Sequence, residues 1–87
     1  MQTLTTASGL SFTILWCGIS TIDLALRFAV QGMELSELFG IITNPNEIAT
    51  LTHRFDENET IYTNYTQFSS INVNPIDGTA IVALRLA

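Results

Sequence analysis

The sequence contains no lysine, and its three basic residues, Arg27, Arg54 and Arg85, are far apart along the chain. Proteins that bind nucleic acid neutralise phosphates with clustered lysine and arginine. Amphipathic helices that lie on membranes carry a basic face. Because this chain has neither feature and a net charge of −5, we expect no binding to nucleic acid or to a membrane surface.

Cysteine is equally scarce. The single thiol, Cys17, excludes an intramolecular disulfide and a cysteine-rich zinc site. It lies in the apolar run 12–19, where a small buried hydrophobe is its expected role. His53 is the only histidine, and its spacing from Cys17 matches no catalytic motif. The chain also lacks a glycine-rich phosphate loop and a metal-spaced ligand set, so we predict no enzyme, no cofactor and no small-molecule substrate.

Charge is absent from residues 1–22. A signal peptide needs a basic start, and a membrane-spanning helix needs about 20 mainly apolar residues. Hydroxyl side chains interrupt this stretch throughout, at Thr3, Thr5, Thr6, Ser8, Ser11 and Thr13. The stretch therefore predicts strands, with neither a signal peptide nor a transmembrane helix.

Charged residues are also few overall, at 13%, while 47% of residues are hydrophobic. An ordinary soluble domain is roughly a quarter charged. At 87 residues the chain predicts a single domain, 1–87, with a large surface for its volume. This deficit of charge favours a subunit whose surface is partly covered by other copies or partners. The alternative is a monomer with a surface of threonine, serine, asparagine and glutamine.

The strongest local pattern is the strict alternation of apolar residues from Ile22 to Val30. Such a period of two predicts a strand with one buried face, and we expect this strand to be central. Its other face would present Ala25 and Ala29 between Asp23 and Arg27, and it is a candidate interface for another chain.

Five further strands and one helix complete the expected fold. A hairpin is predicted over 4–6 and 10–19, and later strands over 49–55, 60–73 and 80–86, with a bend near 66–70. Leu35, Leu38, Phe39 and Ile42 follow helical spacing and form an apolar stripe that we expect to cover one face of the sheet, and the helix is expected to end before Asn44-Pro45. The order βββ-α-βββ predicts an α+β domain, mainly antiparallel, forming a curved sheet or a small, partly closed barrel with the helix packed on it.

A second candidate interface lies in the region 62–68. Tyr62, Tyr65 and Phe68 form a set of aromatic residues there. With no basic groove nearby, core packing or a subunit contact is a stronger interpretation than stacking on bases.

The residues 20–87 resemble small uncharacterised proteins of the structural gene clusters of phages and prophages of Firmicutes and related gut bacteria. The resemblance rests on the strand 24–30, the Asn44-Pro45-x-Glu47 motif after the helix, the strand start 49–52, Tyr62-x-x-Tyr65-Thr66 and the strand 81–84. The family often has glycine before the second tyrosine; Asn64 stands there, and asparagine tolerates a positive φ.

This resemblance implies a virion-associated or tail-region protein in a virion or a bacterial host's cytoplasm. Together with the low charge, it predicts a non-enzymatic structural subunit that acts through self-association or by docking on larger phage proteins. The alternative is a small phage-encoded binding module or regulator that captures a host or phage protein.

Overall fold

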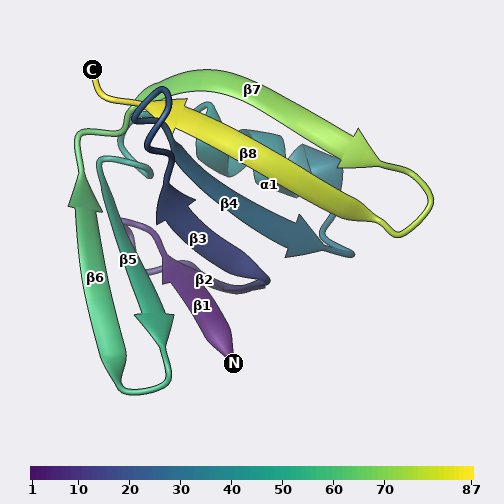
Figure 1. Cartoon of the computed structure of the whole chain (residues 1–87), viewed down its shortest axis with the longest axis horizontal. Helices are drawn as coiled ribbons and strands as arrows, with labels where there is room; N and C mark the ends of the chain where they lie inside the picture. The colour runs from purple at the N-terminus through teal and green to yellow at the C-terminus, as the bar shows by residue number, and fades with distance from the viewer.

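The computed structural model describes residues 1–87 and consists of two four-stranded antiparallel sheets and one helix (Figure 1). Sheet A has the strand order β2-β1-β5-β6, and sheet B has the order β3-β4-β8-β7. The elements are β1 (Gln2–Thr5), β2 (Ser11–Ile14), β3 (Trp16–Ile19), β4 (Leu26–Gln31), α1 (Leu35–Ile42), β5 (Thr50–Phe55), β6 (Asn58–Thr63), β7 (Gln67–Asn74) and β8 (Thr79–Arg85).

The α+β class with mainly antiparallel strands is confirmed, whereas the sheets do not close into a barrel. Eight strands replace the expected six because two of the predicted strands are divided. The stretch 10–19 changes sheets at Leu15, between β2 and β3, and the stretch 60–73 is interrupted at residues 64–66. Asn64 has a φ of 68°, as expected for an asparagine in place of glycine, and a bulge between Phe68 and Ser70 adds the expected irregularity.

A hydrogen-bond network fixes the corner between the two sheets. The side-chain amide of Gln2 donates to the carbonyl of Leu15 (2.8 Å), and its oxygen accepts from His53 Nε2 (2.8 Å). The backbone N–H of Leu15 donates to the carbonyl of Ala29 in β4 (2.7 Å). Sheet A is thereby tied to sheet B at the point where the chain passes between them.

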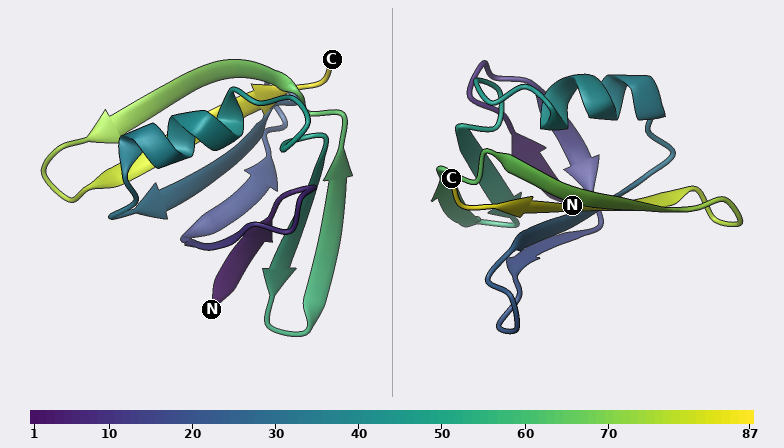
Figure 2. Two further views of the ribbon diagram at one scale, coloured as in Figure 1. Left: turned by 180° about the vertical axis from the view of Figure 1, so that it is seen from behind. Right: turned by 90° about the horizontal axis from the view of Figure 1, so that it is seen from above.

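One hydrophobic core lies between the sheets and the helix. Its largest side chains, including Leu4, Phe28, Leu51 and Leu84, are fully buried. The helix lies on one side of sheet B (Figure 2) and buries Leu38, Ile41 and Ile42. The helix was correctly located, but the prediction of its buried residues was partly wrong: Leu35 and Phe39 are exposed. The helix is apolar on most of its surface, so spacing alone could not identify the face that meets the sheet.

The expected central strand Ile22–Val30 is only partly correct. Leu26, Phe28 and Val30 are buried in β4 as predicted, but Ile22 is 94% exposed and Leu24 also points out. Residues 20–25 form the β3–β4 loop because side chains stabilise a turn there. Asp23 accepts from the backbone N–H of Ala25 (3.1 Å), and this local bonding competes successfully with strand pairing.

Candidate assembly surface

The two predicted interface alanines are not available to a partner. Ala25 and Ala29 are 1% and 0% exposed. Ala29 lies opposite Trp16 on one side and Ile81 on the other, and directly paired residues share a face, so the larger neighbours cover its methyl group. The prediction of an open face at these alanines was therefore wrong. A small side chain inside a sheet, such as that of Ala29, is covered by the strands beside it, whereas Ala25 is buried in the β3–β4 loop.

Asp23 and Arg27 pair directly, contrary to the expectation for a regular strand. The guanidinium of Arg27 binds both carboxylate oxygens of Asp23, at 2.9 and 2.6 Å. The turn at residues 20–25 brings them together, because it shortens the distance that four extended residues would span. Hydrogen bonds from Arg27 and from the Ala25 N–H hold the pKa of Asp23 well below its ordinary value. This bonding fixes the loop that presents Ile22.

The predicted aromatic set is divided between two contacts. Tyr62 and Tyr65 meet edge to face, with ring centroids 6.1 Å apart, and both are half-buried against the core. Phe68 instead meets Phe39 of the helix, with centroids 6.3 Å apart. Of the three, only Phe68 belongs to a largely exposed apolar surface.

That exposed surface follows β7, which forms an outer edge of sheet B (Figure 1). β7 pairs only with β8, so the other side of its backbone has no neighbouring strand. Its eight residues include no charged residue and no proline, and all except the half-buried Ile71 are exposed. Natural edge strands are normally protected from pairing with other chains by charges, prolines or short length. β7 has none of these three protections. Its bulge between Phe68 and Ser70, another feature that hinders edge pairing, leaves 70–74 as the regular part of the strand.

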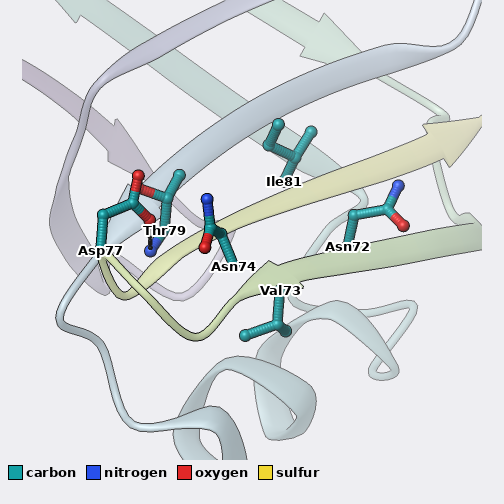
Figure 3. Close-up of a pocket in the computed structure, with 6 residues that line it drawn as sticks. All are labelled: Asn72, Val73, Asn74, Asp77, Thr79 and Ile81. Atoms are coloured by element: carbon teal, nitrogen blue, oxygen red, sulfur yellow. Dashed lines mark hydrogen bonds between the residues drawn. The ribbon is translucent and has the colours of Figure 1, made fainter.

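Helix α1 adds apolar side chains beside this edge. Gly32 N–H donates to the carbonyl of Gly78 (3.2 Å), so the helix begins close to the hairpin end of β7. Val73 points toward the helix side of the sheet (Figure 3). We define the β7–α1 strip as the exposed apolar side chains of these two elements: Leu35, Phe39, Phe68 and Val73.

The β7–β8 hairpin also carries a shallow hollow of about 270 Å³ (Figure 3). It is lined by Asn72, Val73, Asn74, Asp77, Thr79 and Ile81. Several of its polar atoms already serve the turn: Asp77 accepts from the N–H of Thr79 (2.9 Å), and Asn74 accepts from that of Ile76 (3.0 Å). These bonds make the hairpin a firm support for the end of β7.

Cys17 and His53 are not joined by a hydrogen bond. Burial raises the pKa of the Cys17 thiol to about 12, so the thiol stays protonated at neutral pH. His53 bonds to Gln2, and partial burial lowers its pKa, which favours the neutral ring. Cys17 packs against the hydrophobic core, and His53 is hydrogen-bonded to Gln2 at the corner between the two sheets. No cluster of three or more histidine, cysteine or acidic side chains is placed to hold a metal ion.

Sequence reasoning missed most of the strip: it named Phe68 but not Leu35, Phe39 or Val73. The first two were assigned to the buried face of the helix, and Val73 to an ordinary strand. The absence of charge from 67–74 was a usable signal, but the sequence did not show that this strand lies at an edge.

The structure contains no helix with the length and apolar character needed to cross a membrane. Comparisons with protein families, with curated proteins and with solved structures found no match.

Proposed function

We propose that this protein is a non-enzymatic structural subunit of a phage or prophage virion that acts through self-association or by docking on larger virion proteins. The observation that carries the proposal is the eight-residue, uncharged, unpaired edge of β7 beside the apolar β7–α1 strip. Contiguous exposed apolar surface on a small protein is typical of interaction sites. The phage assignment itself rests on the resemblance of residues 20–87.

Other exposed apolar side chains support the same proposal. Fifteen large hydrophobic residues are exposed, while 17 of 87 residues are buried. Ile22 is exposed and lies in the turn of the β3–β4 loop, and this loop projects from the body of the molecule (Figure 2). Single exposed hydrophobes are normal in soluble proteins, but this hydrogen-bonded loop exposes both Ile22 and Leu24 and provides a second apolar contact away from β7. An assembly subunit needs more than one contact when it joins several neighbours.

Mass spectrometry of purified phage particles from the strain that carries the gene tests the virion role. We expect the chain in intact particles at a fixed ratio to the major structural proteins, and its loss when the gene is deleted. A chain present in infected cells but missing from particles would contradict the structural role. It would favour the alternative function, a binding module that captures a host or phage protein.

A further inference from the structure

We propose that two copies of this chain pair antiparallel through β7, joining their two copies of sheet B into one eight-stranded sheet. This inference rests on the proposed self-association and assigns it to one strand. An extended segment adds to a sheet edge through backbone hydrogen bonds, and neighbouring side-chain sites give specificity. β7 offers the edge, and the β7–α1 strip offers the side-chain sites on one face.

The other strand edges are less suited to this pairing. β2 and β3 have four residues each and are separated by the bend at Leu15. β6 has six residues and carries Glu59, which is bound to Arg54 in the neighbouring strand (2.5 Å). A carboxylate beside that edge would be brought close to a second copy, and like charges oppose pairing. β7 is the longest strand and has no charge.

The bulge in β7 selects the register of the pairing. It lies between Phe68 and Ser70, so the regular part of the strand is 70–74. A two-fold axis perpendicular to the sheet relates antiparallel strands, and residues directly opposite each other must share a face. Pairing the whole regular part with itself places Asn72 opposite Asn72 of the second copy. Registers centred elsewhere leave part of 70–74 unpaired or extend the pairing into the bulge.

This register gives each face of the new sheet a consistent chemistry. On the helix side, Ile71 lies opposite Val73 of the second copy, and this contact occurs twice. The exposed strip residues Leu35 and Phe39 of both copies then flank these apolar pairs, because both helices lie on the same face. On the other face, Ser70 lies opposite Asn74, and the two Asn72 amides meet on the axis. All pairs are therefore apolar with apolar or polar with polar.

A charge placed on the axis tests the pairing without disturbing the fold. Asn72 is exposed, so Asn72→Lys leaves the core intact while bringing two ammonium groups together in the dimer. The matched control is Ile61→Lys on the edge strand β6, which is exposed as well. In sedimentation equilibrium we expect the wild type and Ile61→Lys to show about twice the chain mass of 9.6 kDa, and Asn72→Lys to show the chain mass alone. Circular dichroism checks that all three are folded.

Engineered cysteines test the register. In a Cys17→Ala background, Asn72→Cys places two thiols directly opposite, at a Cα separation of roughly 4.5–5.5 Å that suits a disulfide. Ser70→Cys is the control, because its own symmetry mate lies four residues, or about 13 Å, along the strands. Mild oxidation is expected to link Asn72→Cys into dimers and to leave Ser70→Cys monomeric. A mixture of Ser70→Cys and Asn74→Cys should link across the two chains.

The outcomes separate this inference from the proposed function. A wild-type dimer that survives Asn72→Lys and does not link through Asn72→Cys would overturn the β7 pairing while leaving self-association intact. Linking through Ser70→Cys alone would overturn the register. A wild-type monomer at all concentrations, with Asn72→Cys no more linked than Ile61→Cys, would overturn the pairing altogether. Presence in or absence from virions decides the proposed function independently.

Discussion

The same substitution, leucine to alanine, made at two positions of helix α1 distinguishes the contribution of the monomer core from that of the assembly surface. Leu38 lies on the buried face of the helix and is fully buried, whereas Leu35, three residues earlier, is 43% exposed on the β7–α1 strip. Leu35 is the first residue of the eight-residue helix and Leu38 lies inside it, and alanine is at least as good a helix former as leucine, so Leu→Ala costs little helix propensity at either position. Any difference between the variants therefore comes from packing.

The expected magnitudes follow from burial. Truncating a fully buried leucine costs about 2–5 kcal/mol, from lost transfer energy and the cavity left behind. At Leu35 part of the removed surface already faces water and no closed cavity forms, so the cost is about 1 kcal/mol. An eight-residue helix is unstable alone. Leu38→Ala therefore removes a main anchor of α1 from a domain whose total stability is of the order of 5–15 kcal/mol.

Urea unfolding followed by circular dichroism measures these costs, at a protein concentration low enough to keep the chain monomeric. Sedimentation equilibrium at high concentration measures association of the same variants. We expect Leu38→Ala to lose most stability and Leu35→Ala to lose most association. Equal losses of stability, or association unaffected by Leu35→Ala, would refute the assignment of the two faces of α1.

Three other predictions concern the β3–β4 loop and the thiol. Leu24 has a φ of 60°, which is strained for a leucine, so Leu24→Gly is expected to raise the free energy of unfolding by about 0.5–1 kcal/mol in urea titrations. A clear decrease in the free energy of unfolding would show that the contacts of the leucine side chain outweigh the backbone strain. The hydrogen bonds from Arg27 lower the pKa of Asp23 in the folded state, so the contribution of Asp23 to the free energy of unfolding is fully present above its ordinary pKa and is lost as the pH falls below about 4. The difference in urea midpoint between the wild type and Asp23→Asn should therefore narrow from pH 5 toward pH 2. A difference that stays constant would contradict this ion pair. Cys17, with a pKa of about 12, is expected to resist iodoacetamide at pH 8 until urea unfolds the chain; rapid labelling of the folded protein would contradict its burial.

Patterns that depend on neighbouring residues were predicted well from the sequence. The helix before Asn44-Pro45 and the strand predicted over 49–55, observed as Thr50–Phe55, lie where the spacing of apolar residues indicated. The positive φ of Asn64 was anticipated from the resemblance of residues 20–87, in which glycine often stands at this position. These features depend on backbone sterics and local hydrogen bonds, which a short stretch of sequence specifies by itself.

Two predictions failed, one because of local side-chain hydrogen bonds and one because of residues distant in the sequence. Alternation continued through Ile22 and Leu24, but the bonds of Asp23 with Ala25 and Arg27 made a loop there. The exposure of Ala29 could not be judged without knowing that Trp16 and Ile81 flank it. The first error arises because local side-chain hydrogen bonds compete with strand pairing, and the second because the covering residues belong to other strands.

The sequence by itself determined the α+β class, the position of the helix and the shortage of charge that points to association. Only the tertiary structure decided where association can occur, because the order of strands in a sheet is set by long-range pairing. That order places the uncharged β7 at an edge and covers β8, whose only charged residue is Arg85, from both sides. The packing of α1 likewise buried Leu38 and left Phe39 exposed beside Phe68. The candidate surface is thus a property of the fold, formed from residues that are unremarkable in the sequence.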